Sequence, residues 1–364
     1  MSIAIHALQS RSANTVHTVT PAPVSERLAD RTLELIDLPS ESRDEAALAR
    51  HVADVLTAGG VTVRDLGDDC LLAGSPDAPM LLAGHLDTVP AQGNRPGRRD
   101  ERAVHGLGAS DMKGALAVMI ELALAGAPYR CLFFGREELP AVHSALAPLL
   151  SRERPALDCD LVLMMEPTDN EIHAGCLGNI NATWTFRGRS GHSARPWSAD
   201  NAIDRAAAGI GVLAAHEPVP HEFDGLRFVE VASVTTIRGG IAANVIPDHV
   251  ECGVNFRYAP GLDPAAAEAR LRELTGGHGE LDVYSNAPSA PVATGHPLVR
   301  SLVAHGGLTV APKQAWTPVA EFAAGGLPAV NFGPGAPAQA HRQDESIDIA
   351  ALERCYTLLA SFAP

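Results

Sequence analysis

Histidine and carboxylate side chains recur in five short segments of the sequence, and such side chains can carry metal or acid–base chemistry. His85 and Asp87 lie in Gly-His-Leu-Asp-Thr-Val-Pro, and Asp111 ends the run Gly-Leu-Gly-Ala-Ser-Asp ahead of an apolar stretch. Each feature alone has an ordinary structural explanation, either a hydrogen-bonded His–Asp pair or a helix N-cap. Phosphate binding fits poorly, because Asp111 would repel the anion and the glycine spacing matches no phosphate loop.

The other three segments add acidic groups and a second imidazole. Glu137 and Glu138 follow the apolar run Cys-Leu-Phe-Phe, and Glu166 ends the apolar run Leu-Val-Leu-Met-Met. His341 lies in Ala-His-Arg-Gln-Asp-Glu near the C-terminus. Taken singly, these patterns also suit a surface loop, a solvated strand end and a polar loop.

Together the five segments supply two histidines and several carboxylates for one site. Carboxylates that converge without a cation are costly, because burial and mutual repulsion both disfavour their charged forms. Imidazole and carboxylate ligands without thiolate suit zinc, with cobalt or manganese as substitutes, bound as a pair. The combined pattern therefore predicts a two-metal hydrolytic centre.

The composition of the 364-residue chain excludes several classes of protein. Hydrophobic residues make up 46% and charged residues 20%, which is typical of a globular chain of about two domains. The net charge of −15 argues against nucleic-acid binding, because phosphates would be repelled. No apolar run approaches the roughly 20 residues that span a membrane.

The N-terminal segment and the cysteines indicate the compartment. A secretory signal has a positively charged start, then an apolar stretch, then small residues at a cleavage site, and residues 1–22 lack this order. They are therefore predicted to form a flexible tail. The six cysteines are scattered without a CxxC pair, which predicts free thiols in a reducing compartment. We therefore expect a cytoplasmic protein.

Alternating helical and strand patterns predict an α/β fold in which helices cover both faces of a mixed sheet. Short apolar runs that end in polar residues suit buried parallel strands whose chemistry lies at their C-terminal ends. The expected helices are 24–37, 42–58, 113–125 and 142–150, and the expected strands are 61–64, 80–85, 130–135 and 160–166.

The pattern changes after residue 178 to alternating polar and apolar residues, which is typical of antiparallel strands with one wet face. The order β-α-β-β-α-β predicts an inserted α+β domain of the split βαβ, ferredoxin-like type. Its expected strands are 180–187, 227–237, 249–257 and 280–285, with helices 200–215 and 263–274. From 297 a helix, the strand 329–332 and a closing helix 348–361 follow. The predicted division is tail 1–22, catalytic domain 23–178, inserted domain 179–289 and catalytic domain 290–364.

The segments quoted above, from Gly-His85-Leu-Asp87 to Ala-His341, resemble the co-catalytic di-zinc peptidases and deacylases of the M20 family. The resemblance covers nearly the whole chain after residue 22 and implies two zinc ions per subunit in a zinc-peptidase-like catalytic domain. It implies that His85 and Glu166 hold one ion, Glu138 and His341 the other, and Asp111 both. It also implies that Asp87 fixes the His85 tautomer and that Glu137 is the general base, which takes a proton from the attacking water and later gives it to the leaving amine.

The same resemblance gives the inserted domain a role in dimerisation and lid closure. His192, in Gly-His-Ser-Ala-Arg-Pro, would reach across a homodimer interface to stabilise the oxyanion. Asn244 would contact substrate and Arg257 would hold a substrate carboxylate, which bidentate arginine pairing suits. Arg195 and Thr317 are two further candidates for substrate binding. A structural histidine and a surface arginine remain the alternatives for His192 and Arg257.

Within that family the motifs resemble succinyl-diaminopimelate desuccinylases of high-GC Gram-positive bacteria, which implies hydrolysis of N-succinyl-L,L-2,6-diaminopimelate in lysine biosynthesis. Pro318 and Glu321 stand where aspartate and arginine are expected, and the segment 178–180 lacks an expected succinate-binding arginine. Deacetylation of N-acetylornithine or N-acetylcitrulline, and a secondary-metabolism paralogue with another N-acyl substrate, therefore remain alternatives. A non-catalytic binding protein on the same fold is the third hypothesis, but such a protein needs no general base.

Overall fold

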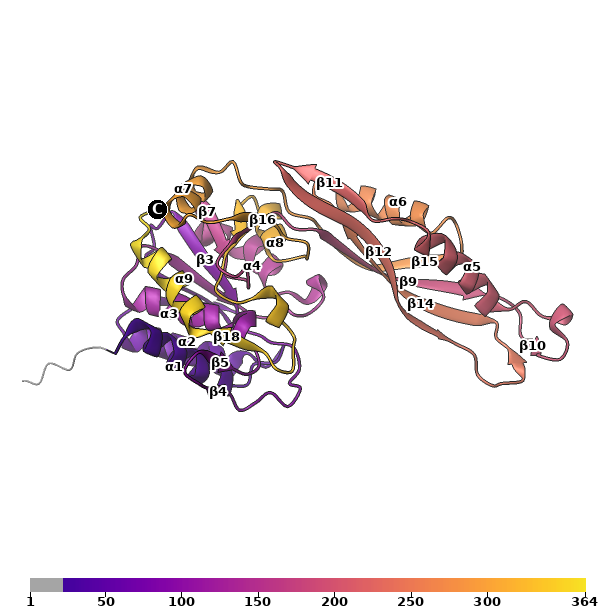
Figure 1. Cartoon of the computed structure of the whole chain (residues 1–364), viewed down its shortest axis with the longest axis horizontal. Helices are drawn as coiled ribbons and strands as arrows, with labels where there is room; N and C mark the ends of the chain where they lie inside the picture. The colour runs from indigo at the N-terminus through magenta and orange to yellow at the C-terminus, as the bar shows by residue number, and fades with distance from the viewer. Residues whose placement is uncertain (1–21) are drawn as a thin grey trace, which may run out of the picture.

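The larger part of the fold is an eight-stranded mixed sheet with strand order β1-β2-β6-β3-β7-β17-β8-β16 (Figure 1). The computed structural model describes residues 22–364. At the centre of the sheet β6, β3, β7 and β17 run parallel, and β3, β6 and β7 are buried along their whole length. The strands are β1 (Val63–Gly67), β2 (Cys70–Gly74), β3 (Met80–His85), β6 (Arg130–Phe134), β7 (Leu161–Met164), β8 (Ile172–Ala174), β16 (Val310–Pro312) and β17 (Ala329–Asn331).

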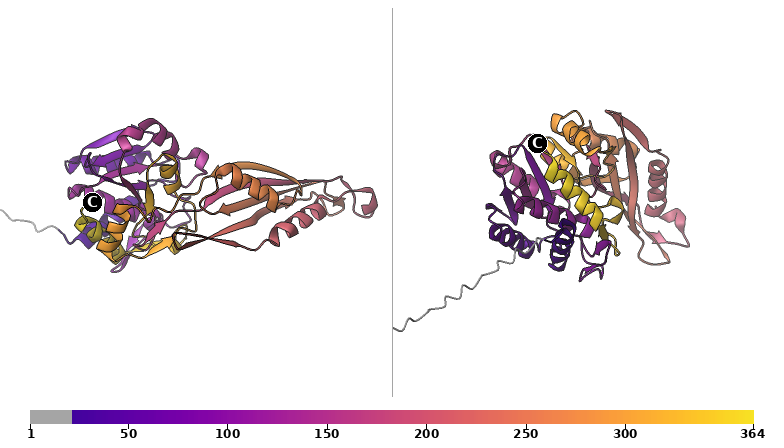
Figure 2. Two further views of the ribbon diagram at one scale, coloured as in Figure 1. Left: turned by 90° about the horizontal axis from the view of Figure 1, so that it is seen from above. Right: turned by 60° about the vertical axis from the view of Figure 1, so that its left-hand side comes forward.

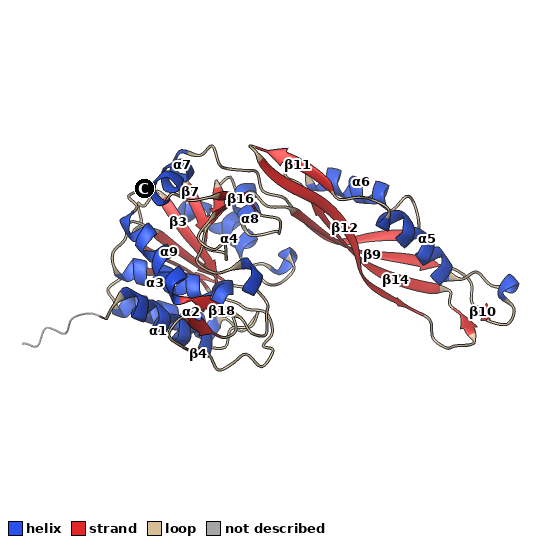
Figure 3. Cartoon of the chain, in the orientation of Figure 1, coloured by secondary structure: helices blue, strands red, loops and turns tan. Residues whose placement is uncertain are grey.

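Helices cover both faces of this sheet, as the apolar patterns predict (Figure 3). α1, α3 and α9 pack on one another, while α4 packs on α8, which lies against β7 and β17. α3 is buried on nearly every side, consistent with its almost wholly apolar sequence. The helices are α1 (Val24–Asp37), α2 (Ala46–Ala58), α3 (Gly114–Leu124), α4 (Leu146–Glu153), α7 (Pro297–Gly306), α8 (Val319–Ala324) and α9 (Ile349–Ser361). A small sheet is formed by β4 (Arg98–Arg99), β5 (Ala103–His105) and β18 (Ser346–Asp348).

A second region, here called the inserted region, is a five-stranded antiparallel sheet of order β11-β12-β14-β9-β15. Two helices pack on it, and its own core contains the aromatic pair Trp184 and Phe186, whose ring centroids are 4.7 Å apart. Without the edge strand β11, the strand order is that of the predicted ferredoxin-like sandwich. Its elements are β9 (Gly178–Arg187), α5 (Ala202–Ala214), β11 (Val219–Phe223), β12 (Leu226–Gly239), β14 (His249–Tyr258), α6 (Pro264–Leu274) and β15 (Glu280–Ala287).

The two regions lie end to end, so the molecule is elongated (Figure 2). The chain passes between them at Cys176 and Ala290, which form an isolated antiparallel bridge. A two-stranded ribbon of β10 (Gly191–His192) and β13 (Val245–Ile246) lies at the far tip of the inserted region (Figure 1).

Two predicted helices begin later than the periodicity indicates. The helix expected from residue 42 begins at Ala46, because the backbone N–H of Ser42 bonds to Thr88 and its hydroxyl bonds to Asp87. The helix expected from residue 142 begins at Leu146, because Pro140 and a 3-10 turn at Ala141–His143 precede it.

The helices and cysteines bear on the predicted absence of membrane spans and of disulfides. No helix within residues 22–364 is both long and apolar enough to cross a membrane. All six cysteines are free, and five of them are buried. The predicted flexible tail lies outside the described residues apart from its last residue.

Candidate functional site

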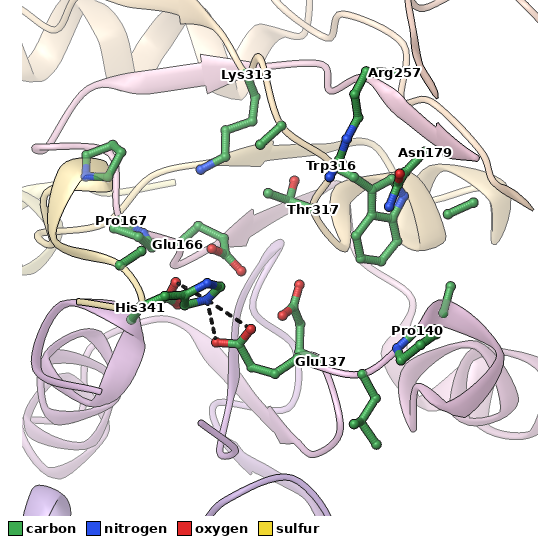
Figure 4. A pocket seen from close by; sticks show the side chains of 18 of the residues that line it. Glu137, Pro140, Glu166, Pro167, Asn179, Arg257, Lys313, Trp316, Thr317 and His341 are labelled. Carbon is green, nitrogen blue, oxygen red and sulfur yellow. Dashed lines mark hydrogen bonds and ion pairs between the residues drawn. The ribbon is translucent and has the colours of Figure 1, made fainter. Parts of the chain in front are cut away.

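The predicted metal ligands converge at one edge of the main sheet, where Figure 4 shows Glu166 and His341 beside Glu137. His85 is the last residue of β3, Glu137 and Glu138 follow β6, and Glu166 follows β7. These three strands are parallel neighbours, so the residues after their C-terminal ends lie at a common edge. The fold therefore brings together side chains as far apart in the sequence as His85 and Glu166, which are separated by 81 positions.

Asp111 lies between the two histidines. Its Oδ1 is 3.1 Å from Nε2 of His85, and its Oδ2 is 3.7 Å from Nε2 of His341. Nε2 of His341 lies 3.0 Å from both carboxylate oxygens of Glu138. The two oxygens of the Asp111 carboxylate are thus directed at two separate groups of ligands, one with His85 and the other with His341. This arrangement suits a carboxylate that bridges two metal ions.

The remaining carboxylates complete these groups. Potential ligand atoms of His85, Glu137 and Glu166 lie within 4.8 Å of one another, as do those of His85, Asp111 and Glu138. Oε1 of Glu166 is buried and has no hydrogen-bond partner among the described residues, although it lies 3.9 Å from Nε2 of His85. A buried carboxylate oxygen without a partner is costly, so this donor set fits divalent cations.

The pKa values of the cluster also show that it holds more negative charge than its own cations neutralise. The pKa of Glu137 is raised well above its usual value, because burial disfavours the carboxylate and Glu166 repels a second negative charge. Burial and the nearby Asp111 likewise raise the pKa of Glu166 to about 7. The hydrogen bond to Glu138 raises the pKa of His341 to about 9. These carboxylates therefore attract positive charge, whether as protons or as metal ions.

Asp87 positions the backbone of the two glutamates through hydrogen bonds. Its carboxylate accepts backbone N–H groups from Glu137 at 2.9 Å and Glu138 at 3.0 Å, and the Ser42 hydroxyl at 2.7 Å. Nδ1 of His85 lies 2.9 Å from the backbone carbonyl of Asp87 and 3.6 Å from its carboxylate. The backbone of Asp87 is therefore the nearer partner of the ring, and its side chain orients the pair of glutamates.

Glu345 is a positioning residue that the sequence analysis quoted without assigning it a role. Its two carboxylate oxygens accept backbone N–H groups from Gly108, Ser110 and Asp111 at 2.8, 2.8 and 2.9 Å. These bonds fix the turn that carries Asp111. The Asp-Glu pair that follows His341 marks this position in the sequence. The sequence alone does not distinguish a carboxylate that binds backbone N–H groups from one that binds a metal ion.

A cavity of about 390 Å³ opens over the cluster, a volume suited to a small molecule. Its lining includes Arg257 and Thr317, two of the predicted substrate residues, and four of the acidic residues of the cluster. Among the lining residues that the sequence did not predict are Asn181, Ser285, Lys313 and Trp316. The cavity therefore offers polar groups from both regions of the chain.

Arg257 is held by an amide network on the inserted sheet. Its Nε donates to Oδ1 of Asn255 at 3.0 Å, and Nδ2 of Asn255 donates to Asn179 at 2.7 Å and Asn181 at 2.8 Å. Burial lowers the pKa of Arg257, as expected for a cation removed from water. No carboxylate of the described residues forms an ion pair with this arginine, so an anionic ligand could use it.

The predicted catalytic residue His192 and the predicted substrate residues Asn244 and Arg195 lie elsewhere in this chain. His192 belongs to β10, and Asn244 lies beside it, with its carbonyl accepting the backbone N–H of Ser193 at 3.0 Å. Arg195 follows in the same loop, and its backbone N–H donates to the carbonyl of His192 at 2.8 Å. None of the three lines the cavity, and β10 lies at the opposite end of the molecule from the main sheet.

The two unexpected residues of the 316–322 segment do not line the cavity either. Pro318 is the N-cap of α8, and Glu321 lies within that helix, where its Oε2 accepts the Ser144 hydroxyl at 3.2 Å. Glu321 instead lines a separate cavity of about 650 Å³ on the far side of Trp316. Glu321 therefore does not contact a ligand in the cavity over the cluster.

Comparison with known proteins identifies relatives over most of the chain. A Mycobacterium tuberculosis protein named putative succinyl-diaminopimelate desuccinylase DapE is 36% identical over 91% of this chain and 96% of its own. A Corynebacterium glutamicum succinyl-diaminopimelate desuccinylase is 33% identical over 89% of this chain and 94% of its own. A Xanthomonas campestris N-acetyl-L-citrulline deacetylase is 32% identical over 81% of this chain and 84% of its own.

Solved structures share the fold at lower identity. The aminopeptidase PepT of Bacillus cereus matches with a TM-score of 0.73 and 22% identity, covering 92% of this chain and 97% of its own. The Bacillus subtilis YXEP protein, described as a dinuclear metal binding peptidase, matches with a TM-score of 0.66 and 17% identity, covering 92% of this chain and 96% of its own. The sequence model of Peptidase family M20/M25/M40 matches residues 81–364. With the acidic cluster at the sheet edge and relatives over about nine-tenths of its length, this chain belongs to the M20/M25/M40 peptidase family.

Proposed function

We propose that this protein is a metal-dependent amidohydrolase that hydrolyses N-succinyl-L,L-2,6-diaminopimelate to succinate and L,L-diaminopimelate. The observation that carries the proposal is the joining of the histidine and carboxylate cluster to a cavity containing Arg257. The names of the M. tuberculosis and C. glutamicum relatives support the choice of substrate.

Two zinc ions, with cobalt or manganese as substitutes, fit the donor set. His85 and Glu166 would hold one ion, Glu138 and His341 the other, and Asp111 would hold both, since its two oxygens face the two histidines. When bound, such ions polarise an amide carbonyl and lower the pKa of a shared water.

The protein's own residues then divide the work of hydrolysis. Glu137 takes a proton from the attacking water and returns it to the departing amine, as a half-buried carboxylate with a raised pKa is suited to do. Asp87 orients Glu137 through the backbone N–H bond, so the carboxylate reaches into the cavity. Arg257 binds a substrate carboxylate and thereby places the scissile amide over the cluster.

His192, Asn244 and Arg195 would serve the site of a second copy of the chain. They lie together at the tip of the inserted region, away from the cavity of their own chain. We therefore propose a homodimer joined through residues 179–289, with catalytic segments 23–178 and 290–364. The inserted domain would close as a lid and supply His192 as an oxyanion donor. A cytoplasmic location remains a prediction.

An N-acetyl amino acid deacetylase is the second candidate. Asn179, rather than an arginine, lines the cavity at the start of β9, and one relative is named N-acetyl-L-citrulline deacetylase. A smaller acyl group without a carboxylate would need fewer cations in the cavity.

A hydrolysis panel separates the two candidates. Zinc-loaded protein is assayed with N-succinyl-L,L-diaminopimelate, N-acetylornithine, N-acetylcitrulline and simple N-acetyl amino acids, comparing kcat/KM. We expect a preference of about 100-fold or more for the succinyl substrate, which is about 2.7 kcal/mol of transition-state discrimination. Clear turnover of an acetylated substrate with negligible succinyl activity would replace the first candidate by the second.

A further inference from the structure

We propose that Lys313 binds a second carboxylate of the substrate, so that the cavity selects N-acyl amino acids with two carboxylates placed around the scissile amide. The proposal rests on the proposed function and names the substrate class of that site. Lys313 is one of only two lysines in the chain, and it lines the cavity together with Arg257.

Lys313 is buried in the cavity without a partner. Only 8% of its surface is exposed, and within residues 22–364 it forms no ion pair or side-chain hydrogen bond. Figure 4 shows its side chain extending into the cavity. Burying an ammonium group is costly unless a counter-charge compensates it. A ligand carboxylate would supply that charge where the described residues do not.

The carboxylates that interact electrostatically with Lys313, those of Asp111 and Glu166, are already proposed as metal ligands. Its charge acts on Asp111 and Glu166, yet neither carboxylate forms a salt bridge with it. Both are proposed ligands of the metal ions. With those carboxylates committed, Lys313 and Arg257 are the lysine and arginine side chains that line the cavity, and neither is neutralised.

The positions of the two cations suit a molecule with charge at two points. Both enter the cavity from the side facing Glu137, and Thr317 lies between them (Figure 4). The Thr317 hydroxyl is buried and also lacks a hydrogen-bond partner among the described residues. Within residues 22–364, two donors without a partner, Lys313 and Thr317, therefore share one wall of the cavity with Arg257, whose Nε donates to Asn255 but which has no counter-charge. This arrangement suits a polar ligand with two negative charges.

The backbone that carries Lys313 is fixed in advance. Lys313 directly follows β16, which pairs in parallel with β8. The side chain of Gln314 exchanges two hydrogen bonds with the backbone of Val229, at 3.0 and 2.6 Å, and Nε1 of Trp316 donates to the carbonyl of Pro288 at 3.1 Å. A preorganised cation loses little conformational freedom when a ligand binds, which favours affinity.

The test uses three substrates that differ by one carboxylate. They are N-succinyl-L,L-diaminopimelate, its N-butyryl analogue, which lacks the acyl carboxylate, and its analogue with the α-carboxylate next to the scissile amide converted to a primary amide. Lys313→Met should lower kcat/KM for the succinyl substrate on the order of 100-fold, mainly through KM. The same variant should change kcat/KM by less than about 3-fold for the N-butyryl analogue, which lacks the acyl carboxylate that Lys313 is proposed to bind. For the primary-amide analogue, which keeps that carboxylate, the loss should match the loss for the succinyl substrate.

Two further variants control the experiment. Lys313→Arg keeps the charge and should recover most of the selectivity. Arg64→Met removes a cation from an exposed position on β1, where Arg64 pairs with Glu153, and should leave all three rates unchanged. If Lys313→Met lowered all three rates equally, Lys313 would merely neutralise the metal ligands, and the proposal would be wrong.

A binding measurement separates this proposal from the proposed function. Calorimetric titration of the wild-type protein and Lys313→Met with succinate and with butyrate requires no turnover. We expect succinate to bind at least about 10-fold more weakly to the variant, with butyrate unchanged. Absence of any hydrolysis by the wild type would overturn the proposed function alone. Equal succinate binding by both proteins, or no succinate binding by the wild type, would overturn the role of Lys313.

Discussion

Glu137 is surrounded by groups that make its negative charge unfavourable, and this environment determines the chemistry available to it. Burial and the neighbouring Glu166 raise its pKa, while Asp87 fixes its backbone at 2.9 Å. A carboxylate with a raised pKa holds a proton more readily than an exposed glutamate does, which suits a general base that must also return the proton.

Replacing Glu137 should therefore remove turnover without removing the metal ions. We expect Glu137→Gln to lower kcat by about 10³-fold or more, since general acid–base catalysis contributes up to about 10⁴-fold. Its zinc content, measured by elemental analysis, should stay at the wild-type level. Glu251→Gln, at an exposed position on β14, serves as the control and should leave kcat unchanged. Loss of zinc from the Glu137 variant would instead identify Glu137 as a ligand.

Glu321 gives a separate prediction about stability. Its side chain is 8% exposed, and burial raises its pKa from 4.5 to about 7, opposed only by the hydrogen bond from Ser144. The folded state thus binds the proton more tightly than the unfolded state. The resulting stabilisation is complete below about pH 4.5 and is lost as the pH rises through 7, a change of about 3 kcal/mol.

Glu321→Gln removes this pH dependence, because the amide does not titrate. Thermal unfolding midpoints of the variant and the wild type should be similar at pH 5, while at pH 8 the variant should unfold at the higher temperature. A difference in midpoint that is constant across this range would show that Glu321 ionises freely in the folded protein.

Residue types in the sequence sufficed to predict the cluster, since His85, Asp111, Glu138, Glu166 and His341 all meet at one edge of the sheet. Partners supplied by the backbone could not be predicted. The carboxylate of Glu345 binds three backbone N–H groups, and the ring of His85 lies nearest a backbone carbonyl. Lys313 and Asn181 were missed because a single polar residue in a loop or strand carries no periodic signal.

At the scale of elements, the turn that presents Asp111 depends on a segment more than two hundred residues away. Glu345 precedes β18, which pairs with β5 just before the turn, so the small sheet sets the position of the Glu345 carboxylate. We expect Glu345→Ala to leave three backbone N–H groups unpaired and to destabilise the protein by about 3 kcal/mol or more.

Loss of the bonds from Glu345 should also weaken metal binding, because the turn that carries Asp111 would no longer be fixed. Zinc affinity, measured by competition with a chelator, should fall at least about 10-fold in Glu345→Ala, as expected when a residue that supports a ligand is lost. Glu353→Ala, on the exposed face of α9, should change neither stability nor affinity. A lower thermal midpoint with unchanged zinc affinity would limit Glu345 to a structural role.

Elements with strong periodicity were predicted best. The helix 24–37 and the strand 80–85 match α1 and β3, because a buried stripe or a wholly buried run is visible in the sequence itself. The short strands β2, β8 and β16 and the six-residue helix α8 were missed, since tertiary pairing rather than local pattern stabilises such short segments. The edge strand β11 was missed for the same reason.

At the scale of the whole molecule, the elongated shape separates two sets of predicted functional residues (Figure 2). His192 lies at the tip of the inserted region, whereas Glu137 lies at the edge of the main sheet. A closed twofold dimer could bring the tip of one chain to the cavity of the other.

Mixing two inactive variants tests this arrangement. We expect His192→Ala and Glu137→Gln each to be inactive alone, because each would lack one group of every site. Refolded together in equal amounts, about half the dimers should be mixed, with one intact site each, restoring about one quarter of wild-type activity. No recovery from a mixture proven to contain mixed dimers would show that His192 does not act across the interface.

We propose that the acidic cluster hydrolyses amides only when it holds two metal ions. The most direct test is to strip the protein with a chelator, add zinc stepwise, and measure both bound zinc per chain and the rate with N-succinyl-L,L-diaminopimelate. We predict no activity after stripping and a plateau of the rate as binding reaches two ions per chain. Full activity in the stripped protein, or a cluster that binds no zinc, would contradict the claim.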